Sequence, residues 1–191
     1  MTTTICPLTI LLAYSVCGSA QTVSAARLLH KTPPDAWASF HRAAKFFDAG
    51  AVAQGSAELE KAIALDPGFP EAHCNLGVAY MVMNRTAEAA AEFRRAVELD
   101  PGNAVSRTNL AVALTALGRQ DEAEVEVRTA VGLDSTHAQA HFLLGLLLQR
   151  HAGMLPFAER HLAYAGRRMP EALEALERLR QADALTASAA Q

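Results

Sequence analysis

Apolar residues recur with helical spacing along most of this 191-residue chain. Around residue 76 a small residue stands between two bulky ones, as Leu76, Gly77 and Tyr80, on one face of an expected helix. The same set returns after 34 residues and again after another 34, as Leu110, Ala111 and Leu114 and then as Leu144, Gly145 and Leu148. A fixed period of 34 predicts an array of helix-turn-helix repeats.

A second apolar set lies about half a repeat further along and predicts a second helix in each repeat. It also alternates small and large residues: Gly55, Leu59 and Ala62, then Ala89, Phe93 and Ala96, then Ala123, Val127 and Ala130. Small residues let two helices approach closely, and large residues fill the space between them. We therefore expect each repeat to be a helical hairpin that needs its stacked neighbours for stability.

The breaks between the expected helices support this register. Residues that tolerate a left-handed backbone, Gly50, Asn84 and Gly118, stand at the same repeat position, with Gly153 near the corresponding place in the fourth repeat. Asp66-Pro67 and Asp100-Pro101 are expected to end the second helix, because proline cannot continue it. The predicted repeats span residues 36–69, 70–103, 104–137 and 138–172.

The pattern resembles the tetratricopeptide repeat. The similarity is best over residues 70–103, where the family's positions hold Asn75, Leu76, Gly77, Tyr80, Ala89, Phe93, Ala96 and Pro101. It implies an all-α fold, a right-handed α-solenoid of helix-turn-helix repeats. Two departures stand out: Ser135 replaces the helix-ending proline of the third repeat, and the fourth repeat has one extra residue between Gly153 and Phe157.

Both ends of the array have their own expected structure. Residues 173–185 carry Leu173, Leu176 and Leu179 on one face, which predicts a C-terminal helix that caps the stack, followed by a disordered tail at 186–191. Residues 21–34 are expected to form a linker or a short docking helix, with Asp35 as the N-cap of the first repeat.

The N-terminal segment resembles an export signal. Residues 1–26 contain no charged side chain, residues 5–16 are mostly apolar, and the small residues Gly18 and Ala20 suit cleavage after Ala20. We therefore interpret residues 1–20 as a signal peptide and expect a secreted protein of the bacterial periplasm, without a membrane span after cleavage. The alternative is a membrane-anchored protein whose N-terminus is left uncleaved or is lipidated at Cys17.

The resemblance also implies a binding surface. In tetratricopeptide arrays the first helices line a concave groove that holds peptides, and transfer by repeat position gives a mainly apolar groove of Phe40, Phe47, Asn75, Val78, Met81, Asn109, Val112, Phe142, Leu146 and Gln149. The family's carboxylate clamp is not expected, because its cationic positions hold Phe40, Cys74, Val105 and Leu143. As the alternative, Phe40, Val78, Val112 and Leu146 simply pack against neighbouring helices.

Composition and motifs argue against other kinds of activity. Seventeen Lys and Arg against 20 Asp and Glu give a formal charge of −3, so no nucleic-acid surface is expected. No nucleophile motif, phosphate loop or carboxylate pair indicates an enzyme, and no cofactor is expected. His137 and His141 are four residues apart, with His151 and His161 downstream, but no carboxylate or thiol is spaced to complete a metal site.

The sequence therefore predicts an exported scaffold that binds a protein or peptide partner in its groove. Two alternatives remain open. One is a non-catalytic regulatory arm of a larger enzyme or envelope assembly system, similar to the repeat arms of sugar transferases that modify proteins. The other is a self-associating module, in which an open end of the array stacks on another copy.

Overall fold

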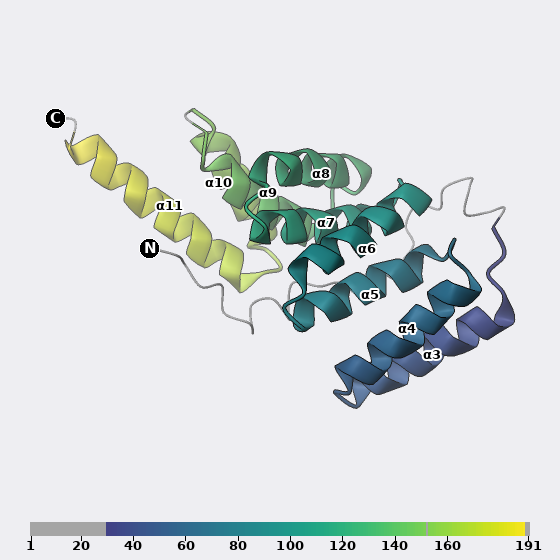
Figure 1. The fold of residues 1–191 in the computed structure, drawn as a ribbon. Coiled ribbons are helices and arrows are strands. Elements are labelled where there is room, and N and C mark those ends of the chain that lie inside the picture. The colour runs from purple at the N-terminus through teal and green to yellow at the C-terminus, as the bar shows by residue number, and fades with distance from the viewer. Residues whose placement is uncertain (1–29, 152, 190–191) are drawn as a thin grey trace. The chain divides into compact units, whose positions relative to one another are not determined.

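The computed structural model describes residues 30–151 and 153–189, with only the backbone for residues 186–189. The chain divides into two compact units, Met1–Ala123 and Glu124–Gln191, and each is described by itself. Within the described residues all regular structure is helical, in nine helices α3–α11 (Figure 1). The all-α repeat fold expected from the 34-residue period is confirmed.

The first unit is a chain of antiparallel hairpins. Its helices are α3 (Pro34–Asp48), α4 (Val52–Leu65), α5 (Pro70–Val82), α6 (Thr86–Leu99) and α7 (Ala104–Ala116). Helix α3 packs on α4 and α5 packs on α6, and the hairpins join where α4 meets α5 and α6 meets α7. Each helix therefore lies against the next along the chain, as a repeat array requires.

The second unit continues the same plan. Helix α8 (Gln120–Leu133) crosses the boundary between the units and is followed by α9 (Ala138–Leu148), α10 (Leu155–Ala165) and α11 (Pro170–Ala189). Helix α9 packs on α10, and α10 packs on α11. Helix α11 is longer at both ends than the 173–185 expected for the terminal helix, because Pro170 already suits the first turn of a helix.

The interior is the set of apolar positions that defined the repeats. Every residue of the three small-and-large sets in the first helices and of the sets in the second helices is buried. Gly77 shows why one position must be small: a Cβ there would lie 2.6 Å from Cε1 of the Phe93 ring. Gly145 stands in the same relation to Leu162 in the fourth repeat, where a Cβ would lie 2.7 Å from Cγ.

The turns confirm the predicted left-handed positions. Gly50, Gly118 and Gly153 have φ angles of 73°, 76° and 82°, and Asn84 is the one non-glycine residue with positive φ in the described part, at 59°. Asp66 and Asp100 follow the last residues of α4 and α6 as C-caps. Helix α8 ends at the equivalent position, Leu133, without a proline. There Asp134 accepts hydrogen bonds from the Thr136 backbone N–H at 2.8 Å and from the Thr136 hydroxyl at 2.7 Å.

One prediction at the start of the array is wrong. Asp35 is not the N-cap of the first helix, because α3 begins at Pro34 and the cap position belongs to Pro33. Proline fits the first helical position since its backbone has no N–H to lose, and Asp35 instead lies in the acidic first turn.

The N-terminal predictions fall mostly outside the described residues. The signal peptide of residues 1–20 lies entirely outside them, as does most of the segment 21–34. At the first described residue the His30 ring lies 2.8 Å from Asp66 Oδ2. No helix within residues 30–151 and 153–189 has both the length and the apolar character needed to cross a membrane.

Candidate functional site

An aromatic cluster occupies the first-helix face of the first repeat. The Trp37 and Phe40 rings of α3 lie 4.7 Å and 5.1 Å, centroid to centroid, from the ring of Phe69, which is completely buried. His41 stacks on Trp37 at 5.6 Å. Trp37 remains 37 % exposed and Phe40 half-buried, so the cluster is anchored in the core and still presents an aromatic surface.

Three residues of the predicted groove pack against other residues of the first unit. Phe47 packs against Gly55 of α4, within its own hairpin, since a Cβ on Gly55 would collide with its ring. Met81 is 4 % exposed and Asn109 is completely buried, with its amide 3.6 Å from the Cys74 sulfur. All three side chains contribute to packing in the first unit; Met81 and Asn109 present almost no surface to a ligand, whereas Phe47 stays half-buried.

The other predicted residues keep some exposed surface. Asn75 and Val78 on α5 and Val112 on α7 are half-buried, on helices that contact each other. In the second unit Phe142 is half-buried and Leu146 is 38 % exposed on α9. Gln149, the C-cap of that helix, directs its amide towards the Gly145 carbonyl oxygen at 3.5 Å.

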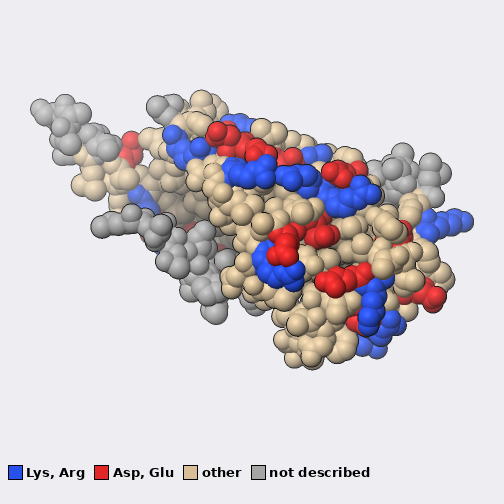
Figure 2. Space-filling model, in the orientation of Figure 1, with Lys and Arg blue, Asp and Glu red and all other residues tan. Residues whose placement is uncertain are grey.

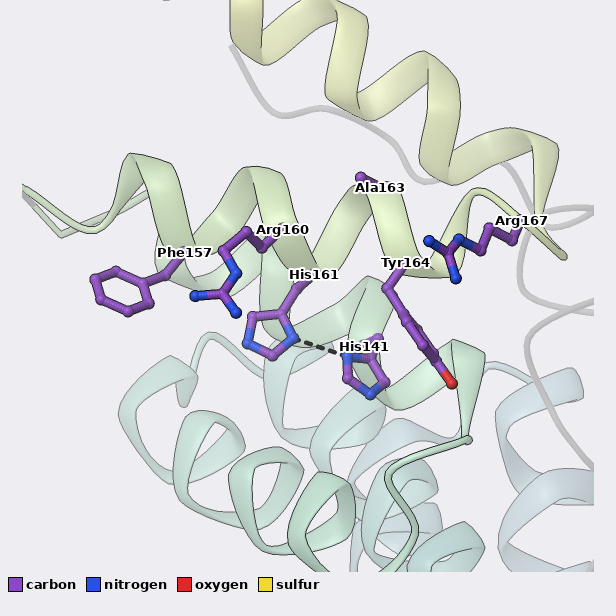
Figure 3. A pocket seen from close by; sticks show the side chains of 7 residues that line it. All are labelled: His141, Phe157, Arg160, His161, Ala163, Tyr164 and Arg167. Atoms are coloured by element: carbon purple, nitrogen blue, oxygen red, sulfur yellow. Dashed lines mark hydrogen bonds between the residues drawn. The ribbon is translucent and has the colours of Figure 1, made fainter.

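A pocket of about 470 Å³ lies in the second unit, on α9 and α10. Figure 3 shows His161 and Tyr164 of α10 extending towards His141 of α9, with Arg160 beside His161 and Phe157 at the outer end, pointing away from His141. Arg167 lies at the far end of the pocket, with its guanidinium carbon 5.9 Å from the centre of the Tyr164 ring. The pocket thus combines two cations, two imidazoles and two aromatic rings.

The two imidazoles are joined by a hydrogen bond between their Nδ1 atoms, at 2.8 Å. His141 Nε2 lies 3.1 Å from the Ser135 carbonyl oxygen, which can only accept, so this nitrogen carries a proton. In the neutral pair His141 Nδ1 must therefore accept from His161 Nδ1–H. The arrangement leaves Nε2 of His161 for other partners.

Burial and charge both oppose protonation of His161. Burial lowers the pKa of His161 below its ordinary value of 6.5, and the neighbouring His141, Arg128 and Arg160 lower it further. Nearby carboxylates are already engaged: Glu124 accepts from Arg128 at 2.7 Å and from His151 at 2.7 Å, and Glu159 accepts from Arg180 at 2.9 Å. The pocket is therefore a positively charged region.

The remaining histidines do not gather into a ligand set. His137 is the N-cap residue of α9 and precedes the helix that carries His141. Within the described residues no group of three or more His, Cys, Asp or Glu side chains is arranged to hold a metal ion.

Sequence reasoning missed the pocket, although its signal was present in the repeat register. His141 stands where the second repeat has His73, and His161, after allowance for the extra residue of the fourth repeat, stands where it has Glu92. His73 and Glu92 are in contact at 2.7 Å, so the register places the two histidines of the fourth repeat at the corresponding contact.

Most other charges of the second helices are paired with each other. Arg85 pairs with Glu88, Arg95 with Glu98, Arg119 with Glu122 and Arg128 with Glu124. On the face drawn in Figure 2 acidic and basic side chains are correspondingly interleaved. Such exposed pairs are worth little individually and keep this surface solvated.

Comparison with known proteins agrees with the fold. Tetratricopeptide repeat models match residues 70–103 and 92–125, and a TPR repeat model matches residues 44–84. No match was found among curated proteins.

Several solved structures are similar. YrrB, described as a TPR protein with an unusual peptide-binding site, has 23 % identity and a TM-score of 0.66, covering 78 % of both chains. The first TPR of Spaghetti (RPAP3), bound to an HSP90 peptide, has 21 % identity and a TM-score of 0.60, covering 64 % of this chain and 97 % of its own. A mutant O-GlcNAc transferase of Thermobaculum terrenum has 26 % identity and a TM-score of 0.63, covering 72 % of this chain and 27 % of its own.

Stacked helical hairpins with a 34-residue period, small residues beneath large ones and left-handed turns define the α-solenoid class of repeat proteins. Within that class, the matched repeat models and the similar structures identify the family. The chain is a tetratricopeptide repeat protein.

Proposed function

We propose that this protein is an exported, non-catalytic scaffold that binds a segment of a partner protein on the first-helix faces of its first unit. The observation that carries the proposal is the aromatic cluster of α3, where Trp37 is 37 % exposed while its ring lies against the buried Phe69. Partly exposed, rigidly held tryptophans are frequent anchors of protein interfaces.

The neighbouring first helices extend this surface. Asn75 and Val78 of α5 and Val112 of α7 offer apolar contacts and one amide that can bond to a peptide backbone. YrrB and the first TPR of Spaghetti (RPAP3), which share the fold, are described with a peptide-binding site and with a bound peptide. These similarities support the class of activity and leave the partner open.

Affinity purification from an envelope extract, followed by mass spectrometry, tests the proposal. We expect partners held by the wild-type chain to be lost when Trp37→Ala and Val78→Ser are combined. The matched control is Leu65→Ala with Ala91→Ser, which removes exposed apolar surface from the second helices α4 and α6. If both variants keep the same partners while remaining folded by circular dichroism, the first-helix surface is not the binding site.

Export is tested separately. Residues 1–20 have the apolar run and small residues of a signal peptide, and residues 1–30 fused to a reporter that folds only after export should give activity. A fusion that begins at residue 21 is the control. Equal activity of the two fusions would contradict export by this segment.

A regulatory arm of a larger enzyme is the second candidate. The observation that favours it is the likeness to the Thermobaculum terrenum O-GlcNAc transferase, of which the match covers only 27 %. Under this candidate the retained partner in the purification would be an enzyme. Self-association is distinguished by light scattering, which would show a mass that rises with concentration.

A further inference from the structure

The fourth repeat differs from the second at the polar contact between its two helices. In the second repeat His73 Nδ1 lies 2.7 Å from Glu92 Oε2, and Nε2 lies 3.2 Å from the Pro67 carbonyl oxygen. In the fourth repeat His141 keeps the corresponding contact with a backbone carbonyl, but its Nδ1 faces the His161 ring at 2.8 Å. An imidazole therefore stands where the second repeat has a carboxylate.

The register shows that this change is confined to the fourth repeat. The position of His161 holds an acid in each of the other three repeats: Glu58, Glu92 and Glu126. Two arginines are added nearby: Arg160 on the same helix replaces Ala57, Ala91 and Val125, and Arg167 in the turn after the helix replaces Ala64, Glu98 and Gly132. At these three positions the fourth repeat thus has three basic side chains, where the other repeats have acidic, small or apolar residues.

These groups converge on one pocket. His141, His161, Arg160 and Arg167 all line the pocket on α9 and α10, together with Phe157 and Tyr164 (Figure 3). Neither arginine forms an ion pair with a carboxylate among the described side chains, whereas Arg178 and Arg180 of the next helix do. Guanidinium groups beside a pocket and without a carboxylate partner favour an anionic ligand.

We propose that this pocket binds the carboxylates of an acidic protein segment. Arg160 and Arg167 pair with the carboxylates, and the neutral His161 beside them adds no negative charge that would repel the segment. Phe157, which is 49 % exposed, and Tyr164 pack against the apolar part of the segment. A carboxylate is the expected anion because the chain itself places one beside the corresponding His73. The site lies on α9, α10 and the turn that follows α10, and it is independent of the surface assigned to the first unit.

Fluorescence anisotropy with a defined probe tests this site. The probe is a labelled, C-terminally amidated octapeptide of glutamate with one phenylalanine, titrated with the full chain. A glutamine version of the peptide removes the charge, a version with a free C-terminus separates terminal from side-chain carboxylates, and inorganic phosphate serves as a competing anion. We expect the glutamate peptide to bind about tenfold more tightly than the glutamine peptide.

Two variants locate the binding. Arg160→Gln with Arg167→Gln should weaken it about tenfold or more, whereas the matched pair Arg94→Gln with Arg95→Gln, on an exposed face of α6, should leave it unchanged. His161→Glu restores the acid of the other repeats beside His141, so it should abolish binding without lowering the melting temperature.

Three results would overturn the proposal. One is equal loss of binding in both arginine pairs, which would indicate unspecific attraction to any cation. Another is undiminished binding by the His161→Glu chain. The third is complete competition by phosphate at the concentration of the peptide carboxylates, which would assign the pocket to small inorganic anions.

Discussion

His141 and His161 meet nitrogen to nitrogen at 2.8 Å, at the place where His73 meets Glu92 in the second repeat. In both His73 and His141 the other ring nitrogen, Nε2, contacts a backbone carbonyl oxygen, so the two histidines are held in the same way. What changes is the chemistry. A carboxylate offers a protonated histidine a counter-charge, whereas a second imidazole offers none, and the pKa of His161 is lowered.

The first prediction concerns this resistance to protonation. Burial lowers the pKa of both His137 and His161 below the ordinary 6.5. An unfolded chain therefore takes up protons from about pH 6.5 downwards while the native imidazoles stay neutral. The free energy of unfolding is therefore highest above about pH 6.5, where these histidines are neutral in both states. It decreases as the pH falls from there through the lowered native pKa values. Melting temperatures should fall between about pH 7.5 and about pH 5.5.

Replacing both groups tests the assignment. His137→Gln with His161→Gln should flatten the decline in melting temperature, while His41→Gln, at an exposed position of α3, should leave it as in the wild-type chain. The carboxylates with lowered pKa act at lower pH, since the ordinary values of Asp66 and Asp134 are 3.8. An unchanged slope in the double variant would show that other groups cause the decline.

The second prediction concerns the close approach of α5 and α6. Gly77→Ala would place a Cβ 2.6 Å from the Phe93 ring, so it should destabilise the fold by about 1–3 kcal/mol. Gly132→Ala is the control: it lies in α8 with nothing within 4 Å, and it should stabilise by about 0.5–1 kcal/mol. Urea unfolding measures both. A neutral Gly77→Ala would mean that the hairpin can open at little cost.

Local features of the fold were predictable because their causes are local. The left-handed turns were predictable from residue type, at Gly50, Asn84 and Gly118. The 34-residue period predicted which apolar residues lie on the buried faces. The groove was harder to predict: Phe47 takes its orientation from the space above Gly55, which repeat position alone does not reveal. The pocket on α9 and α10 was also harder to predict, because its residues come from two helices. The contact between His141 and His161 becomes evident only by comparison with the equivalent contact between His73 and Glu92.

The third prediction concerns the left-handed turns. Gly118 has φ 76° and open space around it, so Gly118→Ala introduces backbone strain without a clash. We expect a loss of about 1 kcal/mol. Asn84→Gly relieves the smaller strain at φ 59° and should be neutral or slightly stabilising. Urea midpoints compare the two. Equal effects of both substitutions would contradict this account of the turns.

The last prediction concerns the missing proline of the third repeat. Ser135 occupies the position of Pro67 and Pro101, and its backbone N–H makes no hydrogen bond to a described residue. Asp66, before the first of these prolines, has the extended backbone that precedes proline, φ −145° and ψ 91°. Ser135→Pro should therefore stabilise the chain by about 0.4–1 kcal/mol, mainly by restricting the unfolded state.

The neighbouring position provides the matched control. Thr136 donates its backbone N–H to Asp134 Oδ1 at 2.8 Å, and proline cannot make that bond. Thr136→Pro should consequently lower the melting temperature while Ser135→Pro raises it. The His141 contact depends on the Ser135 carbonyl oxygen, which proline retains, so the imidazole pair should survive the first substitution. A lower melting temperature for Ser135→Pro would show that the third turn differs from the two that contain proline.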